Sequence, residues 1–200
     1  MMNTSMLPPF PYGAVYFRKS NPPREDWDRD YRTAAEDGMT VFRHWFLWGG
    51  IETRPGLFDW ADYDRQLDLA AENGIKTIIA EMITCAPEWA FREFAHARFE
   101  MSNGKKVDPS IGASTGVGGF PGLCLDHEDY RAAAGKFLTA LVDRYKEHPG
   151  LGGYDIWNEC IYRADACYCP ATAERFRLWL KDRYGDLGAL GKVWHRYSLA

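Results

Sequence analysis

The chain has 200 residues, of which 46% are hydrophobic, and this is enough for one globular domain with its own core. The net charge of −4 gives no basic surface of the kind that binds nucleic acid or anionic lipid. The amino terminus lacks a secretory signal, and no apolar run reaches the roughly 18 residues that a membrane span needs. Five unevenly placed cysteines argue against a disulfide framework. We therefore expect a cytoplasmic, reducing location, with no membrane and no nucleic-acid partner.

The first predicted strand, Gly-Ala-Val-Tyr-Phe at 13–17, is followed by a unit of helix, glycine and strand that recurs three times. In each unit, apolar residues at helical spacing predict an amphipathic helix, and a short β-rich run follows the glycine. The predicted helices are 26–37, 63–73 and 130–148, each followed by a strand, at 40–45, 76–80 and 153–157. A fourth helix is predicted at 173–184. Gly38 and Gly74 are expected to cap the first two helices in the left-handed conformation.

Alternating strands and helices with short connections predict an α/β fold with a parallel sheet. Two architectures fit this order: an open doubly wound sheet, and half of an eightfold barrel. A dinucleotide-binding fold would carry a Gly-x-Gly-x-x-Gly motif after a strand. The run that starts at Gly116 begins like this motif, but Pro121 stands at the position of its last glycine. The pattern of elements alone leaves both architectures open.

Glu159 follows the fourth predicted strand, in the run Tyr-Asp-Ile-Trp-Asn-Glu at 154–159. Barrel enzymes keep their catalytic groups just past the carboxyl ends of parallel strands. Asn158, beside it, can donate and accept hydrogen bonds at a sugar hydroxyl. Retaining glycosidases need two carboxyl groups about 5–5.5 Å apart, one as acid/base and one as nucleophile. An Asn-Glu pair alone is usually only a helix cap or a loop, but after a fourth β-strand it favours a barrel glycosidase.

The chain resembles glycoside hydrolase family 42, the β-galactosidases of clan A, over nearly its whole length. The stretches that carry the resemblance are 13–17, 27–30, 38–43, 55–60, 86–89, 157–159 and 176–185. The resemblance implies a (β/α)8 TIM barrel, of which residues 1–200 are the incomplete N-terminal part of the catalytic domain, with the first four βα units. It also implies a retaining hydrolase that cleaves terminal β-D-galactosides and forms homo-oligomers, often trimers.

Roles for individual residues follow from the same resemblance. Glu159 would be the acid/base, and Asn158 would contact the hydroxyl next to the anomeric carbon. Arg43, at the end of the second strand, matches an arginine that orients carboxylates in the site, although a structural ion pair under the barrel mouth fits it equally. Trp45 and Trp89, both expected just past strand ends, are either sugar-facing rings or parts of the core.

The sequence also departs from the family pattern. The family's nucleophile comes from the seventh strand, so we expect the nucleophile to be missing from this chain and the fragment to be inactive. Phe120 stands where the family has a galactose-binding arginine. Two alternatives therefore stay open: a clan A β-glycosidase with another sugar specificity, and a non-catalytic carbohydrate-binding remnant. A free half-barrel would leave strand edges unpaired and would predict dimerisation or aggregation.

Some family members hold a structural zinc ion with four cysteines, and no other cofactor is implied. Three positions of this chain match those ligands: Cys124, Cys167 and Cys169. Thr172 stands at the fourth position, whereas tetrahedral structural zinc generally has four N or S ligands. Cys160 or His127 would be substitutes, and buried or free thiols are the alternative. Cys85 is assigned to packing.

Overall fold

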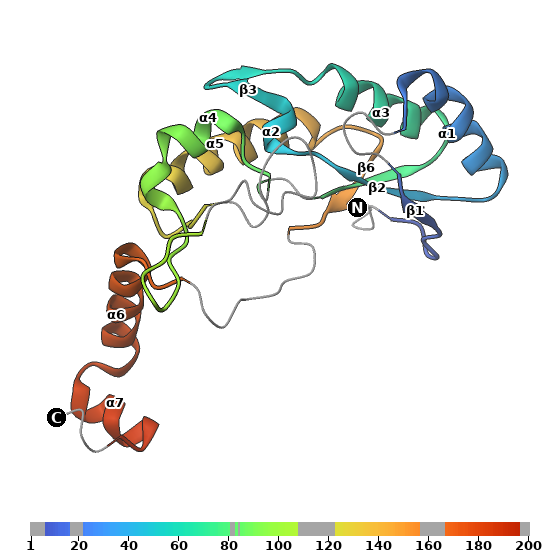
Figure 1. The fold of residues 1–200 in the computed structure, drawn as a ribbon. Coiled ribbons are helices and arrows are strands. Elements are labelled where there is room, and N and C mark those ends of the chain that lie inside the picture. Colours follow the sequence, from blue (N-terminus) through green and yellow to red (C-terminus); the bar gives the residue numbers. More distant parts are fainter. Residues whose placement is uncertain are drawn as a thin grey trace.

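The computed structural model describes residues 7–16, 22–80, 83, 85–107, 123–156 and 167–196. Its centre is a parallel sheet of four strands, in the order β1 (Gly13–Val15), β2 (Val41–Trp45), β5 (Lys76–Ala80) and β6 (Leu151–Tyr154) (Figure 1). Each of these strands lies beside the next one in the chain. A doubly wound sheet reverses its strand order at a switch point, whereas the wall of a barrel continues in one direction.

The connecting helices lie on one side of this sheet (Figure 1). They are α1 (Trp27–Glu36), α3 (Ala61–Glu72) and α5 (Glu128–Tyr145). A doubly wound sheet is covered on both faces, but a barrel carries its helices only outside. The one-sided cover and the sequential strand order therefore identify the sheet as part of a (β/α)8 barrel.

The predicted helix ends are confirmed at two glycines. One residue separates Gly38 from the end of α1, and one residue separates Gly74 from the end of α3. The φ angles of the two glycines are 82° and 70°. Glycine adopts this left-handed conformation without the steric cost that a Cβ atom brings. These turns return the chain to the sheet, and β2 and β5 begin within a few residues.

The helix-facing side of β2 forms the centre of the core. Phe42 and His44 are buried there, and Nε2 of His44 lies 3.0 Å from the hydroxyl of Tyr31 in α1. The same hydroxyl donates a hydrogen bond of 2.8 Å to Oε1 of Gln66 in α3. Complete burial lowers the pKa of His44 to about 3, so this imidazole is neutral at physiological pH.

Short elements that were not predicted lie between the main helices and strands, and those after β2 complete the core beside α5. They are η1 (Arg24–Asp26), α2 (Trp48–Ile51), the hairpin of β3 (Glu52–Arg54) and β4 (Leu57–Phe58), α4 (Glu88–Glu93) and η2 (Ala95–Ala97). Phe137 of α5 is fully buried, and its ring stacks on both Trp48 and Trp60, with centroids 5.7 and 6.2 Å away. The stack joins α5 to the segment that follows β2.

The prediction for the fourth strand is wrong at its start, because β6 begins at Leu151 rather than at residue 153. Its two glycines have low β-propensity and hide the strand in the sequence. Thr77 pairs with Leu151, but Ile78 pairs with Gly153, so the register shifts at this point. Gly150, just before the strand, is packed so closely that a Cβ atom would lie 2.5 Å from the carbonyl oxygen of Leu67.

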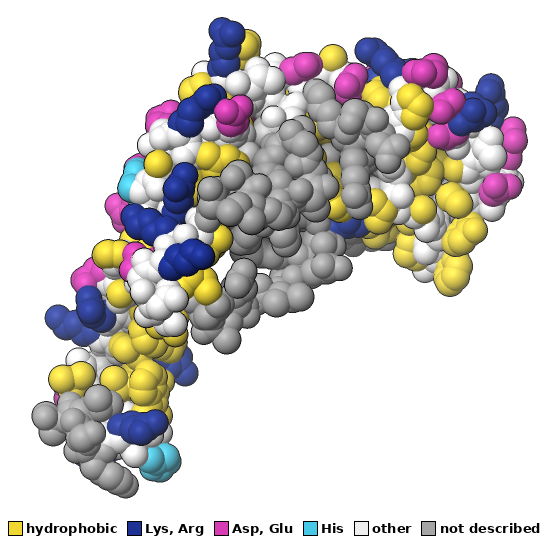
Figure 2. Space-filling view, viewed as in Figure 1, with side chains coloured by type: hydrophobic (Ala, Val, Ile, Leu, Met, Phe, Trp, Pro, Cys, Tyr) yellow, Lys and Arg dark blue, Asp and Glu magenta, His cyan; other side chains and the backbone are white. Residues whose placement is uncertain are grey.

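The fourth predicted helix is present as α6 (Pro170–Tyr184), and α7 (Leu187–Trp194) follows it. Both extend away from the sheet (Figure 1), and hydrophobic side chains gather over them (Figure 2). None of the residues of α6 is buried, and Phe176 and Trp179 are about half exposed. In the described ranges, no helix is both long and apolar enough to cross a membrane.

Candidate functional site

Arg43 and Asp155 form the central ion pair on the face of the sheet opposite the helices. Arg43 alternates along β2 with the buried residues Phe42 and His44, so it points to the other face. Its Nε and Nη2 atoms both lie 2.8 Å from Oδ2 of Asp155. The backbone N–H of Asp155 donates to the carbonyl of Ile79, which continues β6 along β5 by one residue. Asp155 therefore lies just past the carboxyl end of β6, whereas Arg43 is the middle residue of β2 and not at its end, where the sequence had placed it.

This position leads directly to the predicted catalytic segment. Ile156, the next residue, is 79% exposed, so the chain leaves the sheet here at its carboxyl edge. Asn158 and Glu159 lie outside the described residues, and their roles stay predictions. The ion pair matches the structural interpretation of Arg43, and any contact with the catalytic carboxylates also stays a prediction. Asp155 was not singled out as a site residue, although an acid in an otherwise apolar strand was a signal.

The two predicted sugar-facing tryptophans lie in different surroundings. Trp45 is the last residue of β2, pairs in register with Ala80 and lies on the same face as Arg43. Trp89 is in α4, where its indole N–H donates to the carbonyl of Glu52 at 2.9 Å and its ring packs edge-on against Trp48 at 5.8 Å. The contacts of Trp89 are those of a packed residue.

Trp89 also lines a groove of about 620 Å³ between the hairpin, α4 and α5. The buried carboxylate of Glu52 borders this groove and accepts hydrogen bonds from the indole of Trp48 and from the N–H of Gly56. The bond from Trp48 fixes the hairpin to α2, and the bond from Gly56 closes the turn of the hairpin. Of the two tryptophans, only Trp45 thus shares the face of the Arg43–Asp155 pair.

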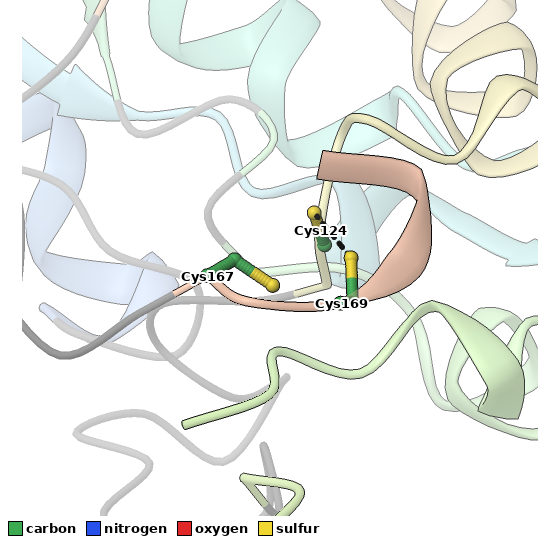
Figure 3. A group of neighbouring side chains, drawn as sticks. All are labelled: Cys124, Cys167 and Cys169. Atoms are coloured by element: carbon green, nitrogen blue, oxygen red, sulfur yellow. Dashed lines mark hydrogen bonds between the residues drawn. The ribbon is translucent and has the colours of Figure 1, made fainter. Parts of the chain in front are cut away.

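The three predicted zinc ligands converge (Figure 3), although they come from two distant parts of the chain. Their sulfur atoms lie within 4.8 Å of one another, and those of Cys124 and Cys169 are 3.8 Å apart. Cys124 precedes α5, whereas Cys167 and Cys169 directly precede α6. The Thr172 hydroxyl lies 3.3 Å from the sulfur atoms of both Cys124 and Cys169.

The thiols of this cluster have unequal acidities. Burial raises the pKa of Cys124 to about 12. Burial also raises the pKa of Cys169, but its hydrogen bonds with the hydroxyl and N–H of Thr172 and with the other two thiols lower that pKa overall. Cys167 accepts a hydrogen bond from the N–H of Glu100. A cation in the centre would favour the thiolate form of each thiol.

The cluster fits a tetrahedral zinc ion in its sulfur geometry. With Zn–S bonds of about 2.3 Å, two sulfur ligands of a tetrahedron lie about 3.8 Å apart, which is the separation of Cys124 and Cys169. Thr172 stands at the sequence position of the fourth ligand, and its hydroxyl lies near two of the three sulfur atoms. His127, a suggested substitute, has its ligand atom in a different group, with His96 and Asp129. Cys160, the other substitute, lies outside the described residues.

The parallel sheet with one-sided helices and an ion pair at its carboxyl edge defines the class of this protein as a TIM barrel. A model of the β-galactosidase family, glycoside hydrolase family 42, matches residues 16–197, so the chain belongs to this family. It is 29% identical over 184 residues to the β-galactosidase Bga of Halorubrum lacusprofundi. It is 30% identical over 174 residues to the β-galactosidase BgaA of Thermus sp..

Solved structures agree on the fold. A β-galactosidase from the Antarctic haloarchaeon Halorubrum lacusprofundi matches 92% of this chain with a TM-score of 0.77 and 27% identity. One from Bacillus circulans sp. alkalophilus matches 95% with a TM-score of 0.74 and 24% identity, and this match shows the fold alone. The matched region makes up 27% of each of these two solved chains. The match to Bga includes 91% of this chain and 25% of Bga. The match to BgaA includes 86% of this chain and 26% of BgaA. The chain thus spans about a quarter of the length of the curated relatives.

Proposed function

We propose that this chain contributes the acid/base half of the active site of a retaining β-galactosidase. The Arg43–Asp155 pair carries this proposal, because it connects β2 across β5 to the residue just past the carboxyl end of β6. Glu159 lies four positions after Asp155 in that segment. The names of the family and of its curated relatives support β-galactosides as the substrate class.

In this mechanism Glu159 protonates the glycosidic oxygen as the leaving group departs, and then takes a proton from water as the second half-reaction begins. Asn158 bonds to the sugar hydroxyl next to the reacting carbon. Arg43 and Trp45 line the same mouth, the first as a cation that positions carboxylates and the second as a ring against the sugar. We assign the nucleophilic carboxylate to the seventh strand of the barrel, as the resemblance to the family implies.

The test is Glu159→Gln in the protein that carries this chain. Without its acid, the enzyme should cleave an unactivated β-galactoside about 10²–10⁴-fold more slowly. A substrate with a nitrophenolate leaving group needs no proton, so its first step should be much less affected. Azide, which needs no general base, should then restore turnover and yield the β-galactosyl azide.

Glu174→Gln is the matched control, because this carboxylate is exposed on α6 and forms an ion pair with the likewise exposed Arg177 of the same helix. It should leave both rates unchanged. Equal losses on both substrates without azide rescue would contradict the acid/base role. A panel of other β-glycosides, run in parallel, would reveal a different sugar specificity if galactosides were the poorer substrates.

We also propose that Cys124, Cys167 and Cys169 bind a structural zinc ion. The convergence of three thiols and the tetrahedral spacing of two sulfur atoms support it. The ion would fasten the start of α6 to the segment that precedes α5. It takes no part in the hydrolysis.

A further inference from the structure

A second group of metal-binding side chains lies beside the cysteine cluster. One ring nitrogen each from His96 and His127 and a carboxylate oxygen of Asp129 lie within 4.8 Å of one another. His96 belongs to η2, His127 is the residue before α5, and Asp129 is in the first turn of α5. Two imidazoles and a carboxylate from two segments, η2 and the start of α5, thus converge on one point.

The spacing of these groups suits a divalent cation. Nε2 of His96 lies 2.9 Å from Oδ2 of Asp129, and the ring centroids of His96 and His127 are 5.2 Å apart. Adjacent ligands at about 2.1 Å from a cation are about 3.0 Å apart in an octahedron and about 3.4 Å apart in a tetrahedron. Small side-chain rotations would therefore bring all three donors to bonding distance.

The backbone already holds the two segments together. The N–H of Cys124 donates to the carbonyl of Ala97 at 2.7 Å, and the N–H of His127 donates to the carbonyl of Cys124. Oδ1 of Asp129 accepts the N–H of Tyr130, which leaves Oδ2 for His96. The donors are thus positioned by contacts that need no cation, and this lowers the cost of binding one.

His127 has ligand capacity that its protein contacts do not use. Its Nε2 atom is buried and has no hydrogen-bond partner in the part of the chain that the structure describes. Such an atom normally has a water molecule or an ion beside it. Burial, followed by the charge of His96, lowers the pKa of His127, so its ring is neutral near pH 7 and offers a lone pair.

We propose that His96, His127 and Asp129 bind a divalent transition-metal cation such as Zn²⁺, Co²⁺ or Ni²⁺. Two imidazoles select these cations over Mg²⁺ and Ca²⁺, which prefer oxygen ligands. The bound cation would join η2 to the first turn of α5 through nitrogen and oxygen donors alone. The positive end of the α5 dipole opposes cation binding, and the negative charge of Asp129 offsets that effect. Because only one ligand is charged, this site should bind a cation more weakly than four thiolates do.

Cobalt(II) is the appropriate probe, because thiolate ligands give an intense charge-transfer band in the near ultraviolet and imidazole–carboxylate ligands do not. Calorimetric and absorbance titrations of the full chain should reveal a binding event without that band. His96→Ala and Asp129→Asn should each weaken this event at least about tenfold. Circular dichroism of both variants should match that of the wild type.

Asp68→Asn is the matched control, because Asp68 is also an exposed carboxylate that pairs with a histidine, His148, at 3.3 Å. It should bind cobalt as the wild type does. The proposal is overturned if no event without the thiolate band occurs, or if His96→Ala binds as tightly as the wild type. Because His96 is half exposed in a short 3₁₀ turn, its substitution tests the site even if Asp129→Asn perturbs the helix.

Discussion

Two nitrogen atoms of Arg43 contact the same carboxylate oxygen of Asp155, although 112 positions separate the two residues. The contact joins β2 to the end of β6 across β5, which lies between them in the sheet. Both side chains are largely withdrawn from solvent, with 18% and 29% of their surfaces exposed. A pair of this kind contributes to stability mainly because the loss of one member leaves the charge of the other poorly solvated.

Asp155→Asn should therefore lower the free energy of unfolding by about 1–3 kcal/mol. Arg43→Met should cost a similar amount. The double variant should cost less than the sum of the two, because it removes both charges together. Urea unfolding of the four proteins measures the coupling. As a control, Arg65→Met removes the exposed contacts to Asp28 and Glu72 and should cost less than about 1 kcal/mol.

His44 should make stability depend on pH. Because its folded pKa of about 3 lies below the ordinary value of 6.5, the unfolded chain binds a proton that the folded chain does not. The contribution of His44 is complete above pH 6.5 and falls by about 1.4 kcal/mol per pH unit as the pH drops toward 3. Unfolding measured at pH 7, 6 and 5 should show a smaller loss for His44→Gln. Equal slopes in both proteins would mean that folding does not lower the pKa of His44.

Thr172→Cys should strengthen the proposed zinc site. The hydroxyl lies 3.3 Å from two of the sulfur atoms, so a thiol in its place would supply a fourth sulfur ligand. We expect zinc affinity to rise at least about tenfold, as measured by competition with a chelator. Ala173→Cys, one position further on, should have no such effect. If both variants gained equally, the gain would come from an added thiol and not from the geometry.

Phe137→Ala should be among the most destabilising substitutions in α5. The ring is fully buried between Trp48 and Trp60, so its removal leaves a cavity between rigid indoles and should cost about 3–5 kcal/mol. Val142→Ala, in the same helix but 38% exposed, should cost less than about 1 kcal/mol. Thermal or urea unfolding of the two variants compares the two positions.

The sequence predicted the repeating elements well, because each is set by local signals. Periodic apolar residues and the terminal glycines at 38 and 74 located α1, α3 and the strands after them. The start of β6 was missed because glycines at 152 and 153 carry no β signal, although packing holds them in the sheet. The hairpin at 52–58 and α4 were missed because they are too short to show a period.

The candidate site was predicted unevenly. The convergence of Cys124, Cys167 and Cys169 followed from the resemblance to the family, and the structure brings these thiols together. The group of His96, His127 and Asp129 has no motif of its own, since its members meet only when η2 folds against the start of α5. The pairing of Arg43 with Asp155 likewise depends on strand register, which only the folded sheet reveals.

The close approach at Gly150 has a consequence for any library of variants of this protein. Every other amino acid would place a carbon atom within 2.5 Å of the carbonyl oxygen of Leu67. The position should therefore reject all nineteen replacements alike, regardless of their polarity or size. In a growth or display selection, Gly150 would therefore tolerate no substitution, as a catalytic residue does. The cause at this turn is steric.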